Sequence, residues 1–424
     1  MGTKFKMIEI YQEENTPVKA FLVGIQDNKI KTSSCLTELK GLVKTLKMEV
    51  GGEIVITRVD PNPQYFLGTG KVQEILEQVE ETESECIIFD FEISPTHQRN
   101  WEKISNIPCF DRQEVILRIF ESRAQTREAT LQVELASLEY SLPRLAHSYG
   151  DMARQRGGAF GSKGSGETKL ELDRRKIQEK IYSIKKELEK VRKNRQTQRK
   201  QREKIPLPVC ALVGYTNAGK SSLLNVLTCS DVYEKDELFA TLDTSTRRLS
   251  KDGKFSILMT DTVGFIKNLP HNLIDAFRST LEEAVISDVL VIVLDSSSDD
   301  VLENYQTTVN VLEEIGAEKN KRLIVLNKWD LADSFQKMRL QEHFDNPICT
   351  STKTKEGLED LINRIFEICM ENQVQCFVPY ENGKIISLIK RECFIISETN
   401  QETGILYNIK TNKEVESVLR EFLI

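Results

Sequence analysis

The sequence predicts an α/β protein built around a phosphate-loop domain, and three observations support this prediction. The apolar run 209–213 leads directly into residues 214–221, G-Y-T-N-A-G-K-S, which fit the pattern of a loop that cradles phosphate groups. Further apolar runs at 289–294 and 322–326 do not alternate in polarity, as in a parallel sheet covered on both faces. Helix-like segments separate these runs, so strands and helices alternate along this part of the chain.

The chain has 424 residues, which is too long for one hydrophobic core. Its composition, 39% apolar and 29% charged, is that of a soluble globular protein. We predict four parts: a small N-terminal α/β domain at 1–120, a helical hairpin with a glycine-rich loop at 121–204, the phosphate-loop domain at 205–372, and a small C-terminal α/β domain at 373–424.

The N-terminal domain is predicted from two strand-like and two helix-like segments. The strands are expected at 54–56 and 86–90, and the helices at 70–79 and 114–142. A loop is expected at 151–168, because glycines crowd this stretch and it contains too few apolar residues for a core.

A long helix is expected at 168–204, ended by Pro206 and Pro208. Its apolar residues form a narrow seam of the kind that packs on a partner helix. The seam consists of Leu170, Ile177, Ile181, Ile184, Leu188 and Val191. We expect it to pack antiparallel against the helix around Leu131, Leu135 and Leu138.

The charge is unevenly distributed. Between residues 174 and 204 there are fourteen cations and four anions, a surplus of ten, although the whole chain carries a net −7. A cationic segment on an acidic protein predicts a polyanionic partner such as RNA. The alternative is a solvated segment whose charges only keep the protein soluble.

The nine cysteines are odd in number and form no C-x-x-C pair, so we expect reduced thiols in a cytoplasmic protein. No apolar run approaches the ~18–20 residues of a membrane span.

Three further motifs separate the nucleotide classes that a phosphate loop alone leaves open. They are D-T-V-G at 261–264, N-K-W-D at 327–330 and T-S-T-K at 350–353, each following a strand-like run. A carboxylate at Asp330 can accept hydrogen bonds from guanine N1–H and N2–H₂ together, which adenine cannot offer, while Asn327 ties this loop to the phosphate loop. Backbone N–H groups at 350–353 can donate to guanine O6. The order of the motifs therefore predicts a Ras-like GTPase domain.

The same motifs predict the groups that act on the phosphates. Lys220 can reach the β- and γ-phosphates, and the Ser221 hydroxyl can bind Mg²⁺. Asp261 can hold Mg²⁺ through water, and the Gly264 N–H can contact the γ-phosphate.

A switch threonine is expected in residues 239–246, F-A-T-L-D-T-S-T, and composition leaves Thr241, Thr244 and Thr246 open. The residue after Gly264 is Phe265, where a Ras-like protein has a glutamine that orients the attacking water. We therefore expect slow intrinsic hydrolysis. Asn217 stands where a side-chain oxygen could help to hold K⁺ beside the phosphates, and the alternative is a tolerated loop residue.

Taken together, these motifs resemble the HflX family, in the Obg–HflX branch of translation-associated GTPases. The resemblance also rests on residues 161–175, similar to the family's glycine-rich hinge, on 122–136, similar to its first long helix, and on 239–243, similar to its switch. It implies that Thr241 is the threonine beside Mg²⁺. It further implies a GTPase that binds the large ribosomal subunit and its ribosomal RNA and dissociates stalled or idle ribosomes under stress.

The catalytic residues predicted in this way are Lys220, Thr241 and Gly264, and the metal ligands are Ser221 and Thr241. The full nucleotide-binding set is Gly214, Tyr215, Thr216, Asn217, Ala218, Gly219, Lys220, Ser221, Phe239, Ala240, Thr241, Leu242, Asp243, Asp261, Thr262, Val263, Gly264, Asn327, Lys328, Trp329, Asp330, Ser351, Thr352 and Lys353.

We expect a cytoplasmic monomer that associates with ribosomes or a membrane surface, without stable membrane insertion and without DNA as a partner. Two other functions stay open: a GTP-dependent ribosome assembly factor, and an RNA-binding module in which GTP is a structural ligand. Multiple turnover in the presence of ribosomal subunits would separate the enzyme from the module.

Overall fold

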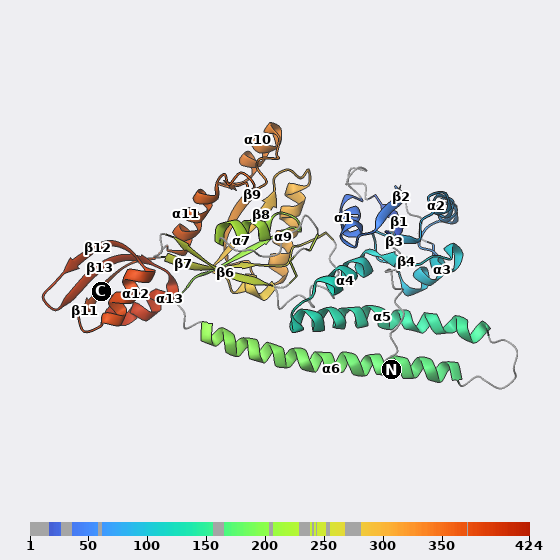
Figure 1. Ribbon diagram of the computed structural model, residues 1–424, viewed down its shortest axis with the longest axis horizontal. Coiled ribbons are helices and arrows are strands. Elements are labelled where there is room, and N and C mark those ends of the chain that lie inside the picture. The colour runs from blue at the N-terminus through green and yellow to red at the C-terminus, as the bar shows by residue number, and fades with distance from the viewer. Residues whose placement is uncertain are drawn as a thin grey trace. The chain divides into compact units, whose positions relative to one another are not determined.

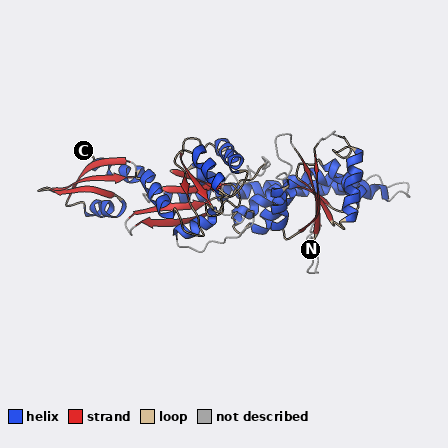
Figure 2. Ribbon diagram, turned by 90° about the horizontal axis from the view of Figure 1, so that it is seen from above, coloured by secondary structure: helices blue, strands red, loops and turns tan. Residues whose placement is uncertain are grey.

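The computed structural model describes residues 17–26, 36–57, 62–155, 165–202, 207–228, 238–239, 241–242, 244–251, 255–267, 281–370 and 372–424. The chain forms two compact units, Met1–Leu188 and Glu189–Ile424, and each is considered by itself. Figure 1 labels the helices and strands, and Figure 2 shows the strands in red and the helices in blue. In the described ranges, no helix has the length and apolar character needed to cross a bilayer.

The first unit contains a four-stranded sheet in the order β2-β1-β3-β4, in which all neighbouring strands are parallel. Its strands are β1 (Lys19–Ile25), β2 (Glu49–Ile56), β3 (Cys86–Phe89) and β4 (Cys109–Asp111). The helices of this α/β layer are α1 (Thr37–Thr45), α2 (Thr69–Glu81), α3 (Pro95–Ser105) and α4 (Arg112–Arg123). Strands β3 and β4 are buried along their whole lengths, as in a sheet covered on both faces.

The single helix expected at 114–142 is wrong. Helix α4 ends at Arg123, and a second helix, α5 (Arg127–Gln155), begins after a short break. Ala124 is extended, with φ −63° and ψ 115°, and the Thr126 hydroxyl caps α5 by accepting a hydrogen bond of 3.2 Å from an amide of its first turn. Both helices bury apolar faces, so apolar periodicity continues across the break and does not reveal it.

The loop expected at 151–168 is only partly right, because α5 continues to Gln155 and α6 (Ser165–Arg202) begins before the expected end of the loop. Residues 156–164, with most of the glycines of the predicted loop, lie outside the described residues.

Helices α5 and α6 form the antiparallel hairpin that the sequence predicts (Figure 1). Ile177, Ile184 and Leu188 of the predicted seam are buried. Ion pairs join Arg127 to Glu187 at 2.9 Å and Lys180 to Glu134, so the first residues of α5 lie beside the middle of α6.

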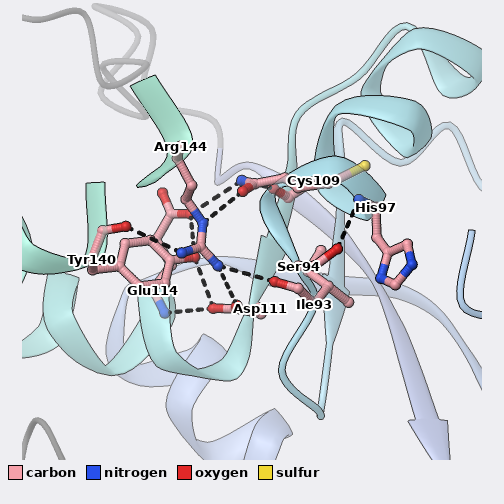
Figure 3. Close-up of polar contacts among 9 residues, drawn as sticks. Ile93, Ser94, His97, Cys109, Asp111, Glu114, Tyr140 and Arg144 are labelled. Carbon is pink, nitrogen blue, oxygen red and sulfur yellow. Dashed lines mark hydrogen bonds and ion pairs between the residues drawn. The ribbon is translucent and has the colours of Figure 1, made fainter. Parts of the chain in front are cut away.

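A polar cluster attaches the hairpin to the N-terminal sheet, and its centre is Arg144 of α5 (Figure 3). The Arg144 guanidinium donates hydrogen bonds to Asp111 Oδ2 at 3.0 Å, to Gln98 Oε1 at 2.9 Å and to the Ile93 carbonyl at 3.1 Å. The Tyr140 hydroxyl donates to the other Asp111 oxygen at 2.9 Å. Asp111 is fully buried, and burial raises its pKa despite the positive charge of Arg144.

We expect Arg144→Met to destabilise the first unit by about 3 kcal/mol, because it leaves the buried Asp111 carboxylate without its cation. The matched control is Arg127→Met on the same helix. The Arg127 side chain is 78% exposed in its pair with Glu187, so we expect a loss below about 1 kcal/mol.

Urea unfolding can be followed in the first unit alone. The chain has two tryptophans, Trp101 in the first unit and Trp329 in the second, so a Trp329→Phe background reports only Trp101. Equal shifts of the unfolding midpoint for the two arginine variants would contradict the stabilising role of the buried cluster.

The second unit contains a six-stranded sheet in the order β10-β9-β8-β5-β7-β6. Its strands are β5 (Val209–Gly214), β6 (Ser245–Lys251), β7 (Phe255–Asp261), β8 (Val289–Asp295), β9 (Lys321–Asn327) and β10 (Ile348–Cys349). Its helices include α7 (Lys220–Thr228), α9 (Val301–Glu314), α10 (Ser334–His343) and α11 (Leu358–Cys369). Strand β6 alone pairs antiparallel, at the sheet edge. The α/β class is confirmed, although β6 was not predicted.

The C-terminal segment forms a three-stranded antiparallel sheet in the order β11-β13-β12. Its elements are β11 (Asn372–Pro379), α12 (Gly383–Glu392), β12 (Phe394–Asn400), β13 (Gly404–Thr411), α13 (Lys413–Leu419) and the 3₁₀ turn η2 (Arg420–Phe422). The order strand, helix, two strands, helix agrees with the predicted small α/β domain. The boundaries at 120, 204 and 372 remain predictions.

Candidate nucleotide-binding site

The phosphate loop connects the end of β5 to the start of α7, and its first and last glycines cannot be replaced without strain. Gly214 has φ +144°, and a Cβ there would lie 2.3 Å from the Val293 carbonyl oxygen. Gly219 has φ +90°, and a Cβ there would lie 2.3 Å from Asn327 Nδ2. Glycine is the residue that tolerates both the positive φ and the close approach.

Lys220 is buried at the first residue of α7. Its Nζ donates hydrogen bonds to the carbonyls of Gly214 at 3.1 Å and Tyr215 at 2.8 Å. An ammonium group has three donors, so these two bonds orient the side chain and leave one N–H for a phosphate oxygen. Burial lowers the pKa of Lys220 to about 8, against the opposing effect of the Asp261 charge.

Three oxygen-bearing side chains meet beside Lys220. The Ser221 hydroxyl lies 2.6 Å from the Thr241 hydroxyl and donates to Asp261 Oδ2 at 2.7 Å. Asp261 is fully buried, and burial raises its pKa although the Lys220 charge and the Ser221 hydrogen bond oppose the shift. Its second oxygen, Oδ1, has no hydrogen-bond partner within the described part of the chain.

These oxygens fit a small divalent cation. Hydroxyl and carboxylate oxygens are hard ligands of the kind that Mg²⁺ selects, usually together with waters and substrate phosphates. The unpartnered Asp261 Oδ1 is a buried acceptor that a cation-bound water could satisfy. The residues present therefore fit Mg²⁺, and the roles of Ser221, Thr241 and Asp261 toward it remain predictions.

The structure distinguishes two of the three switch candidates. Thr241 lies against Ser221, whereas Thr246 belongs to β6, where its hydroxyl is 3.0 Å from that of Thr260 in β7. Of the neighbouring predicted contacts, Phe239 and Leu242 are buried, while Ala240 and Asp243 lie outside the described residues.

The base-side loops are joined by Asn327, which is fully buried at the end of β9. Its amide donates to the Ala218 carbonyl of the phosphate loop at 2.9 Å and accepts from the Thr350 hydroxyl at 3.3 Å. The link from Asn327 to the phosphate loop was predicted, whereas its link to Thr350 was not. Asp330 is half-buried at the end of the same motif, and Trp329 packs in the core.

Hydrogen bonds within the backbone of residues 350–353 reduce the number of N–H groups that could donate to guanine O6. The N–H groups of Thr350 and Ser351 already donate to the carbonyls of Leu326 at 2.8 Å and Glu356 at 3.1 Å. Among the described residues, the amides of Thr352 and Lys353 have no such partner. Ser351 instead shapes the loop, because its hydroxyl accepts from the Thr354 amide at 3.1 Å.

Two contacts escaped the sequence analysis. Lys328 of the base motif pairs with Asp295 at the end of β8, at 2.7 Å. The Tyr215 hydroxyl accepts a hydrogen bond from the Lys267 amide at 2.8 Å. Neither pair has a sequence signal, because each joins residues from different strand ends.

The Phe265 side chain lies in the core. It is 2% exposed and packs with apolar residues of β5 and β8. Asn217 has φ +59°, a left-handed conformation that asparagine tolerates better than most residues. This conformation explains an asparagine here without a cation, so K⁺ binding remains a prediction.

The fold and the site define a P-loop GTPase. Residues 33–121 match the family described as GTP-binding GTPase N-terminal, 123–202 match GTP-binding GTPase Middle Region, and 209–328 match 50S ribosome-binding GTPase. The chain belongs to the GTPase HflX family, whose members are similar to it over almost its whole length.

Three curated relatives illustrate this similarity. GTPase HflX of Akkermansia muciniphila is 40% identical, over 94% of this chain and 95% of that protein. That of Lacrimispora saccharolytica is 39% identical, over 98% of each. That of Escherichia coli strain K12 is 40% identical, over 91% of each. The resemblance inferred from the motifs is confirmed.

Proposed function

We propose that GTP is hydrolysed to GDP and phosphate by the group of side chains around Lys220. The remaining Lys220 N–H donates to the β- and γ-phosphates, and the Gly264 N–H donates to a γ-phosphate oxygen. Ser221 and Thr241 hold Mg²⁺, with Asp261 accepting from its water shell. Bound Mg²⁺ would neutralise charge that develops on the phosphate oxygens. The convergence of Ser221, Thr241 and Asp261 is the observation that carries this assignment.

Guanine is selected on the opposite side of the loop. Asp330 accepts from N1–H and N2–H₂, and the free amides of Thr352 and Lys353 donate to O6. The connection from Asn327 to Ala218 holds this pocket at a fixed distance from the phosphates. A pocket built on such hydrogen bonds rejects a base that leaves its polar groups unpaired.

Intrinsic hydrolysis is slow in this proposal, because Phe265 cannot orient the attacking water. The missing group must come from a partner, from the backbone or from a bound cation, and a K⁺ held near Asn217 is one such source. A GTPase of this design hydrolyses GTP slowly until its partner is present.

We propose that the partner is the large ribosomal subunit, and that the protein acts in the cytoplasm to dissociate stalled or idle ribosomes. The match of residues 209–328 to a family described as 50S ribosome-binding supports this. Helix α6 supports it too, since Lys186 and Lys190 are exposed one turn apart on a strongly cationic helix. Cations on an exposed helix suit the phosphates and sugar hydroxyls of folded RNA.

The test is GTP turnover by the full chain with and without purified large subunits. We expect stimulation by at least about tenfold, because a partner supplies groups that the free enzyme lacks. Lys186→Glu with Lys190→Glu should weaken the stimulation and leave turnover without subunits unchanged. Unchanged turnover in the presence of subunits, at low and at moderate salt, would contradict the proposal that the large ribosomal subunit is the partner.

A second measurement addresses dissociation. Whole ribosomes are sedimented with the protein and a non-hydrolysable GTP analogue, and separated subunits are expected. Intact ribosomes together with binding to immature large subunits would favour the assembly factor. The buried Phe265 also favours an RNA-binding module with GTP as a structural ligand, and retention of one GTP per chain without turnover would indicate that function.

A further inference from the structure

Two backbone hydrogen bonds hold the segment that follows Gly264 against the phosphate loop. The backbones of Tyr215 and Phe265 pair as neighbouring parallel strands do. The Thr216 amide donates to the Phe265 carbonyl at 2.8 Å, and the Phe265 amide donates to the Gly214 carbonyl at 3.1 Å. The Phe265 side chain lies in the core.

Lys267 extends this attachment by two residues, and it is held at both its backbone and its side chain. Its amide donates to the Tyr215 hydroxyl at 2.8 Å. Its Nζ pairs with Glu303 at 2.8 Å and with Asp300 at 3.3 Å, at the start of α9. Burial would lower the pKa of Lys267, but the hydrogen bond to Glu303 and the charge of Asp300 outweigh it and raise the pKa. Lys267 is therefore a charged tether between Tyr215 and α9.

The position of Gly264 follows from this attachment. A Cβ on Gly264 would lie 2.8 Å from Thr216 Cα and 2.9 Å from Lys220 Nζ, so the glycine is close to the ammonium that serves the phosphates. Small shifts of residues 265–267 would move the Gly264 amide relative to that ammonium. A donor held in place before the reaction stabilises developing charge without a cost of reorganisation.

We propose that Tyr215 is a positioning residue for hydrolysis: its hydroxyl, acting on the Lys267 amide, fixes the Gly264 N–H for the γ-phosphate. Lys267 supports this role through Glu303 and Asp300. The proposal rests on the role given to Gly264 above. It adds that the Tyr215 side chain, by holding the Lys267 amide, sets the geometry of the Gly264 amide.

Tyr215→Phe removes one oxygen atom and keeps the ring in place. We expect single-turnover hydrolysis, measured without ribosomal subunits, to fall about fivefold, as the loss of one neutral hydrogen bond predicts. The affinity for a non-hydrolysable GTP analogue should fall by a similar factor or less. The affinity for GDP should stay within about twofold, because GDP lacks the phosphate that Gly264 contacts. A general loosening of the phosphate loop would weaken GDP as well.

Lys267 provides the second arm of the experiment. Lys267→Met should slow hydrolysis, Lys267→Arg should keep it near the original rate, and the double variant with Tyr215→Phe should be little slower than the slower single variant. The matched control is Tyr305→Phe in α9, whose ring packs on Phe344 at 5.0 Å between centroids. This control removes a phenolic hydroxyl from the same unit but leaves the hydrogen bond from the Lys267 amide to Tyr215 in place.

The proposal is overturned if Tyr215→Phe hydrolyses GTP at the original rate, if GDP binding falls as much as analogue binding, or if Tyr305→Phe is equally slow. Thermal unfolding of each variant checks folding, and Lys267→Met carries the test should Tyr215→Phe not fold. Because subunits are absent, the result is independent of the ribosomal proposal. Loss of hydrolysis in Ser221→Ala but not in Tyr215→Phe would leave the site assigned and remove only the positioning role.

Discussion

Asp330→Asn should change the base preference from guanine to xanthine. The Asp330 carboxylate is expected to accept two hydrogen bonds from guanine, and an amide can accept only one of them. Xanthine has a 2-keto group that accepts from the asparagine amide. We expect GTP affinity to fall by about a thousandfold or more, because sites built on such hydrogen bonds discriminate by ~10⁴–10⁵. Calorimetric titration of the unaltered chain and of the variant with GTP and with XTP measures the change.

The matched control is Asp333→Asn, in the same loop. The Asp333 side chain caps α10 by accepting from the Gln336 amide at 2.8 Å, and asparagine caps a helix equally well. We expect nucleotide affinities within about twofold of the original for this control. Retained preference of Asp330→Asn for GTP over XTP would refute the assignment of the pocket, as would tighter binding of ATP than of GTP to the unaltered chain.

Ser221→Ala should abolish hydrolysis that depends on Mg²⁺. The change removes a cation ligand and also the hydroxyl that lies 2.6 Å from Thr241 and 2.7 Å from Asp261. The buried Asp261 carboxylate then loses both the hydrogen bond from Ser221 and the neighbouring cation. We expect kcat/KM to fall at least about a hundredfold, the scale of losing a preorganised electrostatic group. Steady-state turnover across a Mg²⁺ titration measures it.

Two further variants serve as controls for this result. Ser222→Ala, one residue further along α7, should keep the activity, and Ser221→Thr should keep most of it because the hydroxyl remains. Chelation of Mg²⁺ should bring the original chain down to the rate of Ser221→Ala and change that variant little. An unaltered Mg²⁺ dependence in Ser221→Ala would show that the cation binds elsewhere.

The sequence was sufficient for the central sheet and for the order of the site loops. Strands β5, β8 and β9 are apolar without alternation, and in a parallel sheet their carboxyl ends meet at one edge. The motifs that follow β5, β7 and β9 were therefore expected to lie together. The structure brings these motifs together: the Ser221 hydroxyl donates to Asp261, and the Asn327 amide donates to the Ala218 carbonyl.

Other features had no local signal. Strand β6 is polar and half-exposed at a sheet edge, so its pattern was not distinguishable from a loop, and Thr246 was considered as a switch residue for the same reason. The choice of Thr241 depends on a distance to Ser221, which spacing does not provide. The tether from Tyr215 to Lys267 joins residues 52 positions apart through a backbone amide, a donor that every residue type except proline carries.

The burial of Phe265 has an evolutionary consequence. In a Ras-like enzyme, the residue at this position is a glutamine that orients the attacking water, so a change there affects the rate of hydrolysis rather than the fold. Here a glutamine would bring an amide into a packed apolar layer, where an unpaired polar group costs roughly 1–3 kcal/mol. A single mutation at this position therefore does not give an enzyme that hydrolyses GTP faster without its partner. Mutations here would destabilise the fold before they removed the dependence on that partner.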